Sequence, residues 1–169
     1  MEWVQLVDER DKELGIMEKM AAHKAAALHR AISVFIFNSK GEMLLQQRAA
    51  QKYHSGLLWT NTCCTHPRPG EDLLAAAQRR LSEEMGLHCL LHHQFSFLYK
   101  ADLDDGMTEH EYDHVYFGYT DDVPQANPDE VAAWAYRKME DIAVQLAEQP
   151  ALFTEWFKLI FIKLKRAAE

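Results

Sequence analysis

The sequence predicts a single α+β sandwich domain rather than a doubly wound parallel sheet. Segments with the composition of strands come first, one well-marked helix interrupts them, further strands follow, and the end of the chain is helical. A doubly wound sheet would instead require strands and helices to alternate regularly. At 169 residues the chain is long enough for one domain with a substantial core and too short for two comfortable ones.

The N-terminal part is predicted to be mainly extended. Residues 4–7 form a short strand that pairs with the segment after a turn at residues 11–15. Residues 31–37 are rich in Ile, Val and Phe, and Asn-Ser-Lys-Gly at 38–41 is a turn signal. Because residues 42–47 then return, we expect a β-hairpin here.

The clearest helix is predicted at residues 71–85, after a stretch at 51–70 that is expected to be mostly loop with a short strand. Four apolar side chains recur every fourth residue and form one stripe, and Gly86 supplies a C-terminal stop. The stripe consists of Leu73, Ala77, Leu81 and Met85.

The remaining elements follow the same reasoning. Strands are expected near residues 95–100 and 112–119, with Asp-Asp-Gly at 104–106 in the turn between them, and another strand at 132–137. Residues 139–166 are predicted to be helical with an interruption at Pro150.

Composition and charge narrow the class of function. Hydrophobic residues make up 48% and charged residues 26%, as in an ordinary soluble globular protein. The net charge of −8 argues against a nucleic-acid partner, although a local cluster of Lys, Arg and metal can still bind a small anion. The sequence contains neither a signal-peptide-like apolar run nor a stretch of roughly 18 apolar residues, so we expect a cytoplasmic protein without a membrane partner.

Two carboxylates surround a histidine in Glu109-His110-Glu111. On a strand Glu109 and Glu111 point to the same face and His110 points away. Two such charges resist joint ionisation unless a cation lies between them. They are either surface carboxylates of an edge strand or, with imidazoles from His23, His29 and His66, a five-ligand site for a divalent cation such as Mn²⁺, Zn²⁺ or Mg²⁺.

The segment TNTCCTHP at residues 60–67 places a thiol two residues from an imidazole. The pair Cys64 and His66 suits a metal site, a nucleophile with its base, or simple packing. Adjacent cysteines rarely bind one metal together, which disfavours a zinc–thiolate site. With three cysteines in a chain that is not expected to be secreted, a disulfide framework is not expected, so free thiols are available for chemistry. A thiol next to a metal-bound imidazole stays protonated near its usual pKa of roughly 8.5, and beside a carboxylate it forms an acid–base pair.

The predicted helix ends in RRLSEEMGL at residues 79–87. Arg80 and Glu84 lie one turn apart, which is either an exposed ion pair of about 0.3–0.5 kcal/mol or an arginine for phosphate beside a carboxylate for Mg²⁺. Lys19, Arg48 and Lys52 could add positive charge around the same anion.

RRLSEEMGL resembles the helical part of the Nudix signature, REUXEEXGU, but has Arg80 where Nudix hydrolases place a glutamate. TNTCCTHP, together with EHEYDHV at residues 109–115 and the two early histidines, resembles the type I isopentenyl diphosphate isomerases, which use the Nudix fold without its hydrolytic chemistry. The match extends in order from about Lys19 to Trp156. It implies a Nudix-type α/β/α sandwich with a mixed β-sheet, a core at about 29–166, and an N-terminal extension at 1–28 that contributes metal ligands.

The resemblance implies a role for each matching residue. A first divalent cation is bound by His23, His29, His66, Glu109 and Glu111, and Mg²⁺ is bound by Glu84 together with the substrate diphosphate. Cys64 matches the catalytic cysteine, whereas Cys63 does not, and Glu111 is its proton-transfer partner. Tyr99 lies beside the reacting carbons, and Trp156 covers the hydrocarbon. The diphosphate is surrounded by Lys19, Arg48, Lys52 and Arg80.

The implied reaction moves the double bond of isopentenyl diphosphate to give dimethylallyl diphosphate through a carbocation-like intermediate, in isoprenoid biosynthesis. It requires an acid, a base, a dry pocket and stabilisation of positive charge. Two other functions remain as alternatives. A Nudix hydrolase of a nucleoside diphosphate derivative would need a carboxylate in place of Arg80, and an inactive metal-stabilised binding module would not need Cys64 and Glu111. We expect the protein to act as a monomer on a small-molecule diphosphate.

Overall fold

The computed structural model describes residues 1–168, so Glu169, the last residue of the predicted domain, lies outside the described residues. Within that range the helices are α1 (Lys19–Ala25), α2 (Leu73–Met85), α3 (Met139–Glu148) and α4 (Glu155–Ala168), with 3-10 turns at Asp104–Gly106 and Pro150–Leu152. The strands are β1 (Trp3–Val7), β2 (Glu13–Glu18), β3 (His29–Phe37), β4 (Met43–Arg48), β5 (Trp59–Thr60), β6 (Cys63–Thr65), β7 (Leu91–Asp102), β8 (Thr108–Tyr119) and β9 (Val131–Arg137).

The strand β3 is the centre of the sheet. One edge of β3 pairs in parallel with β8, from His29 opposite Glu111 to Phe37 opposite Tyr119. The other edge pairs in turn with β1, β6 and β4, all antiparallel. The sheet is therefore mixed, as predicted.

The predicted hairpin of β3 and β4 exists only at its turn. Phe37 opposite Met43 joins the two strands, and β4 then leaves to pair with β5 and β9. The reason is that β6 occupies the same edge of β3 further along, and each backbone edge can pair with one strand at a time. The segment expected to contain one short strand accordingly contains two, β5 and β6.

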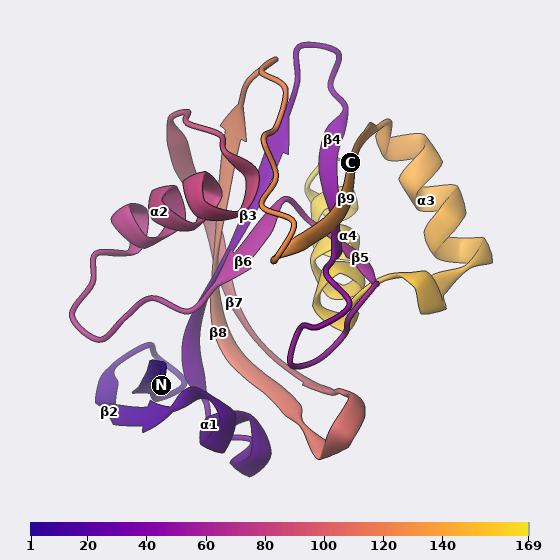
Figure 1. Cartoon of the computed structure of the whole chain (residues 1–169). Coiled ribbons are helices and arrows are strands. Elements are labelled where there is room, and N and C mark those ends of the chain that lie inside the picture. Colours follow the sequence, from indigo (N-terminus) through magenta and orange to yellow (C-terminus); the bar gives the residue numbers. More distant parts are fainter. Residues whose placement is uncertain (169) are drawn as a thin grey trace.

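Two hydrophobic clusters lie on opposite faces of the sheet. Along β3, Ile32, Val34 and Ile36 belong to the cluster under α2, whereas Phe35 belongs to the cluster under α4. This alternation follows from the two-residue side-chain period of a strand. Figure 1 shows α2 on one side of the sheet and α3 and α4 on the other, which confirms the α/β/α sandwich.

The helix α2 has the ends that the sequence predicts within two residues. The Asp72 side chain accepts a hydrogen bond from the Ala75 amide at 3.1 Å, and Gly86 ends the helix in the left-handed region with φ 62°. A side chain at residue 86 would also collide with the Gln125 carbonyl. The predicted apolar stripe of α2 packs against the sheet.

The short helix α1 was not predicted from the sequence. It begins because the Glu18 carboxylate accepts hydrogen bonds from the Met20 and Ala21 amides, at 3.0 and 2.8 Å. It ends at Ala26, which has a φ of 53°. The helix turns the buried side chain of His23 toward β3 and β8.

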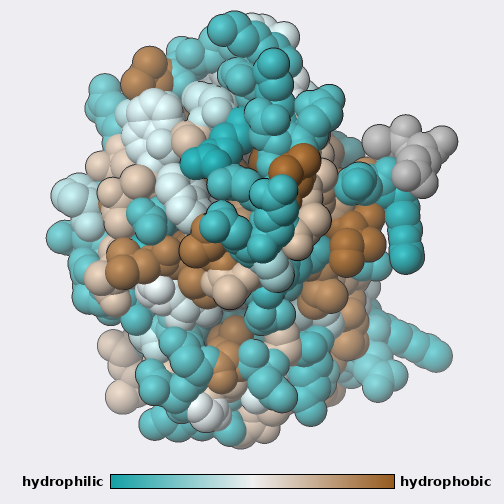
Figure 2. Space-filling view, turned by 90° about the vertical axis from the view of Figure 1, so that its right-hand side faces the viewer, coloured by the Kyte–Doolittle hydropathy of each residue, from teal (hydrophilic) through white to brown (hydrophobic). Residues whose placement is uncertain are grey.

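The surface over α3 and α4 carries apolar side chains in separate patches divided by polar ones, as Figure 2 shows. Val144, Leu159 and Ile162 contribute to it. None of the helices within residues 1–168 is both long and apolar enough to cross a membrane.

Candidate active site

One face of the sheet changes from apolar to polar along β3 and β8. Phe35 and Val115 lie in the cluster under α4, and the buried residues on the same face toward the start of each strand are His29, Glu109 and Glu111. Because β3 and β8 are parallel, their polar ends coincide, and His29 lies directly opposite Glu111. The strand period predicted that Glu109 and Glu111 share a face, and the structure confirms it.

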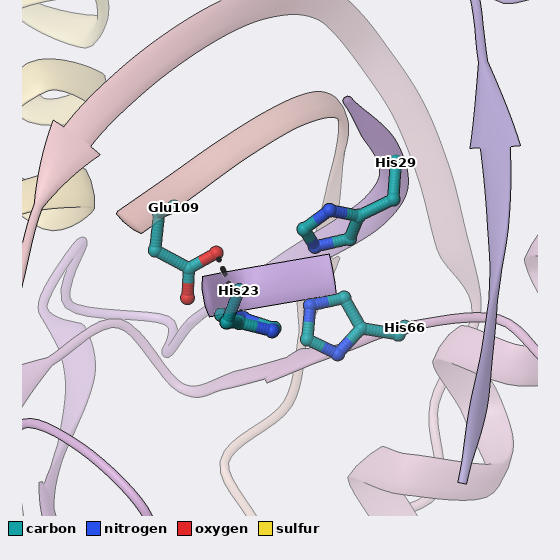
Figure 3. A group of neighbouring side chains, drawn as sticks. All are labelled: His23, His29, His66 and Glu109. Atoms are coloured by element: carbon teal, nitrogen blue, oxygen red, sulfur yellow. Dashed lines mark ion pairs between the residues drawn. The ribbon is translucent and has the colours of Figure 1, made fainter. Parts of the chain in front are cut away.

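The four side chains shown in Figure 3 come together from α1, β3, the loop after β6, and β8. They are His23, His29, His66 and Glu109, and one nitrogen or oxygen of each lies within 4.8 Å of the others. Among the described residues, the inner atoms His23 Nε2, His29 Nε2 and Glu109 Oε2 have no hydrogen-bond partner although they are buried. Buried polar atoms without partners are costly, and a shared cation would satisfy all three.

The two most buried imidazoles are oriented as metal ligands usually are. His23 Nδ1 lies 2.7 Å from the Lys19 carbonyl oxygen, and His29 Nδ1 lies 2.8 Å from that of Ala27. A carbonyl accepts, so each Nδ1 carries a proton, and in the neutral ring the lone pair of Nε2 is then free to face the centre. The residues present therefore fit a divalent cation.

Glu111 lies at the edge of this group. Its Oε2 is 3.1 Å from His66 Nε2 and 3.6 Å from His29 Nε2, while the Tyr99 hydroxyl donates to its Oε1. Burial and the neighbouring Glu109 raise the pKa of Glu111. Glu111, the predicted fifth ligand, thus lies beside the cluster of four and lines the cavity. Its Oε1 accepts the hydrogen bond from Tyr99.

Burial keeps two of the imidazoles neutral. It lowers the pKa of His66 to about 4 and lowers that of His29, while the carboxylate of Glu111 opposes both shifts. Burial acts to raise the pKa of Glu109, but its close contacts with Glu111, His23 and His54 hold that pKa below its usual value. Neutral imidazole and ionised carboxylate are the forms that bind a metal.

The pKa of His66 predicts a pH dependence for the metal-free protein. The unfolded chain takes up the His66 proton near pH 6.5 and the folded chain only near pH 4, so stability should fall as the pH drops between these values. Urea unfolding with a chelator present should show this slope, and His66→Asn should flatten it. An identical slope in both proteins would assign the effect to other groups.

The two adjacent cysteines point to opposite faces of the sheet because they are consecutive on β6. Cys63 is fully buried in the cluster under α2, whereas Cys64 lies on the face of α4 and lines the cavity. Cys64 Sγ donates to Asn61 Oδ1 at 3.2 Å and accepts from the Trp156 indole N–H at 3.1 Å. Burial, with Asp113 nearby, raises the pKa of the Cys64 thiol to about 12, so it is protonated at neutral pH.

A cavity of about 490 Å³ opens between α2, the N-terminal strands and α4. Eleven of the thirteen predicted site residues line it, while His23 and His29 lie buried behind it. The lining residues are Lys19, Arg48, Lys52, Cys64, His66, Arg80, Glu84, Tyr99, Glu109, Glu111 and Trp156.

The predicted cationic residues contact carboxylates or an aromatic ring. Lys52 Nζ lies 2.5 Å from Glu130 Oε2, and Arg80 lies 2.6 Å from both Glu84 Oε1 and Glu83 Oε2. Lys19 pairs with Glu2 at 2.6 Å, and the Arg48 guanidinium lies 5.2 Å from the Trp156 ring centroid. Glu84 is buried, and burial raises its pKa. An entering anion would compete with these carboxylates for the same cations.

Two buried residues of the site were not predicted from the sequence. Asp113 continues the two-residue period of Glu109 and Glu111, so the pattern contained the signal that places it on the same face; Ser33 Oγ donates to it at 2.7 Å. His54 lies 3.0 Å from Glu109 Oε1, and no spacing in the sequence distinguishes it from the other histidines.

Comparisons with known proteins agree with these features. The family model of the NUDIX domain matches residues 27–157. An isopentenyl-diphosphate Delta-isomerase of Pectobacterium atrosepticum is 56% identical over 161 residues, which cover 95% of this chain and 90% of the relative. A protein of that name from Serratia proteamaculans is 47% identical over 159 residues, covering 94% of this chain and 89% of the relative.

Solved structures match the fold at low sequence identity. A Deinococcus radiodurans protein has a TM-score of 0.78 and 21% identity, with coverage of 94% of this chain and 97% of that one. A MutT protein from Methanosarcina mazei has a TM-score of 0.68 and 19% identity, with coverage of 84% and 96%. At such identities the likeness shows the fold alone, and it is the close sequence relatives that identify the family. The chain belongs to the isopentenyl-diphosphate Delta-isomerase family and has the Nudix fold.

Proposed function

We propose that the protein converts isopentenyl diphosphate to dimethylallyl diphosphate, with Cys64 and Glu111 as its proton-transfer pair. The observation that carries the proposal is the placement of these two side chains. β6 and β8 pair with opposite edges of β3. Cys64 and Glu111 therefore line the same cavity from the two sides of β3. A substrate carbon chain between them can gain a proton from one and lose a proton to the other.

The two groups suit a reversible proton exchange. Cys64 Sγ retains its proton because it is buried and close to Asp113, and the Glu111 carboxyl also has a raised pKa. In a reversible isomerisation the group that donates in one direction accepts in the other. The Tyr99 hydroxyl orients Glu111 through its hydrogen bond to Oε1.

The aromatic residue Trp156 serves the hydrocarbon part of the substrate. It is 3% exposed, and its indole N–H contacts Cys64 Sγ. The faces of aromatic rings stabilise a desolvated cation by about 2 kcal/mol or more, and the exclusion of water prevents capture of the carbocation as an alcohol.

The diphosphate is bound by the four cationic side chains that line the cavity, namely Lys19, Arg48, Lys52 and Arg80. Glu84 is the carboxylate that would hold Mg²⁺ with it, since such ions take one or two protein carboxylates and leave other positions to phosphate oxygens and water. A divalent cation in the His/Glu site, Mn²⁺, Zn²⁺ or Mg²⁺, would supply fixed positive charge and lower the pKa of its carboxylate ligands.

The alternative, hydrolysis of a nucleoside diphosphate derivative, requires a carboxylate where Arg80 lies. In the structure Arg80 is held by Glu83 and Glu84 and presents positive charge to the cavity. Hydrolysis would also leave Cys64 without a task. The positive charge of Arg80 therefore favours isomerisation over hydrolysis.

The reaction is tested by incubating the metal-loaded protein with isopentenyl diphosphate in deuterated water. We expect deuterium in the dimethylallyl diphosphate that forms, because the added proton exchanges with solvent. Phosphate release from a panel of nucleoside diphosphate derivatives, without isomerisation, would instead support the hydrolase.

Replacing Glu109 with Gln is expected to weaken metal binding by about 10- to 100-fold, because the amide presents no negative charge to the three imidazoles. Metal content of the purified variant, measured by elemental analysis beside the parent protein, checks this. Unchanged content would remove Glu109 from the ligand set.

We also propose that residues 1–169 act as one domain and as a monomer in the cytoplasm. His23 of the extension and His29 of the core contribute to the same cluster, so the extension is part of the working unit. Light scattering on the eluted protein should give a mass near 19.6 kDa, and twice that mass would contradict the monomer.

A further inference from the structure

The loop between β4 and β5 carries a histidine that reaches the metal-binding group from the substrate side. His54 is 3% exposed, and its ring centroid lies 5.7 Å from that of His23 and 5.6 Å from that of Trp156. Its neighbour Lys52 lines the cavity on the same loop. His54 therefore lies where the predicted metal and diphosphate sites meet.

The His54 ring contacts the outer oxygen of a candidate metal ligand. His54 Nε2 lies 3.0 Å from Glu109 Oε1, whereas Glu109 Oε2 faces His23 Nε2 at 3.4 Å. His54 Nδ1 lies 3.0 Å from Ser55 Oγ. A hydroxyl that donates to Nδ1 leaves the ring proton on Nε2, where it faces Glu109. His54 is not one of the four side chains whose ligand atoms converge within 4.8 Å.

The backbone of His54 contacts the diphosphate side of the cavity. Arg48 Nη2 donates to the His54 carbonyl oxygen at 3.1 Å. The next residue, Ser55, has a φ of 53°, and its amide donates to Asp104 Oδ1 at 3.3 Å. A non-glycine residue in this region is held there by its surroundings. His54 thus links the loop between β4 and β5 to both Glu109 and Arg48.

We propose that His54 is a positioning residue that orients the Glu109 carboxylate toward the cation and couples the metal site to the loop carrying Arg48 and Lys52. The inference rests on the proposed metal and diphosphate sites of an isomerase. His54 acts through Glu109 and Arg48 and needs no contact with the substrate. Residues that contact a metal ligand from its outer side, as His54 Nε2 does at 3.0 Å from Glu109 Oε1, commonly change metal affinity by about 10- to 100-fold when removed.

The test compares His54→Phe, which keeps a buried ring without a donor, with His54→Gln, which restores an N–H. For each stripped protein we would measure the Kd for Mn²⁺ by chelator competition, and then kcat and KM for isopentenyl diphosphate at saturating Mn²⁺ and Mg²⁺. His54→Phe should weaken Mn²⁺ binding by about 10- to 100-fold and raise KM more than it lowers kcat, and His54→Gln should recover most of both.

A matched control lies outside the cavity. His114 Nε2 lies 2.9 Å from Asp11 Oδ2, and His114 is 8% exposed, so His114→Phe also removes a buried imidazole that contacts a carboxylate. This control should leave the Mn²⁺ Kd unchanged. Ser55→Ala is a milder change that removes only the hydroxyl contact to His54 Nδ1. It should shift the Mn²⁺ Kd in the same direction as His54→Phe, and it tests the proposal if His54→Phe does not fold.

The outcomes separate this inference from the proposed function. A His54→Phe protein that binds Mn²⁺ as tightly as the parent would overturn the positioning role, and so would an equal loss in His114→Phe. A parent protein that binds no divalent cation would overturn the metal site and this inference together. A parent that binds Mn²⁺ but does not isomerise would refute the proposed reaction, while the change in Kd would still establish the role of His54 at the metal.

Discussion

Cys64→Ala is expected to lower the turnover of isopentenyl diphosphate by about 10²- to 10⁴-fold, whereas Cys63→Ala should retain most of it. Cys64 Sγ faces the cavity and carries a proton that a methyl group cannot exchange. Cys63 is 0% exposed in the cluster under α2, so losing its sulfur leaves a small void and affects stability rather than chemistry. Initial rates at saturating metal, with thermal unfolding of both variants, check the two results.

The comparison of the two variants is sharp because the residues are adjacent on one strand and differ in the face that they occupy. Cys63→Ala should be destabilised by about 1 kcal/mol, in the range found when one buried heavy atom is removed from a core. Equal loss of turnover in both variants, at equal stability, would show that the reacting thiol has been misassigned.

The second large effect is expected for Glu111→Gln, which should lower kcat by about 10²- to 10⁴-fold even when the metal site is saturated. The amide keeps the shape of the side chain and can still accept the Tyr99 hydroxyl bond, but it cannot exchange a proton with the substrate. The remaining candidate ligands His23, His29, His66 and Glu109 still converge, so metal binding should weaken without being lost.

Tyr99→Phe provides the matched control for this variant. It removes the hydroxyl that contacts Glu111 Oε1 but keeps the carboxyl and the ring, so its loss in kcat should be much smaller than that of Glu111→Gln. Rates are compared at equal metal content, measured in the same samples. A Glu111→Gln protein within tenfold of the parent kcat under these conditions would exclude Glu111 as a proton-transfer group.

The order and class of the elements were readable from local patterns. The apolar stripe of α2, its stop at Gly86, and the strand that places Glu109 and Glu111 on one face each depend on residues close together in the chain. Local spacing predicts such features because side-chain periods of a helix and a strand are fixed by backbone geometry. β7 is longer at both ends than the predicted strand at residues 95–100, and β8 begins before the predicted strand at residues 112–119. The two strands continue to pair beyond their most apolar residues.

Features that depend on competition between distant segments were not readable. β3 and β4 pair only next to their turn, because β6 pairs with the rest of that edge of β3. No local pattern in the sequence predicts the pairing of β6 with β3. The helix α1 is short and carries a weak pattern, so its cap at Glu18 became apparent only in three dimensions. His54 had no spacing that linked it to Glu109, which lies 55 positions later in the chain.

The residue types that the chemistry needs can be read along the chain: a thiol, paired carboxylates, imidazoles, and an arginine where a hydrolase needs an acid. Which of these side chains lie close together depends on the fold. Cys64 is separated from Cys63 by the pleat of β6, and four ligand atoms from four segments converge within 4.8 Å because β3 and β8 run parallel and α1 folds against their polar ends. The physical reason is that side-chain periods are local, whereas edge pairing and burial are settled by the whole chain.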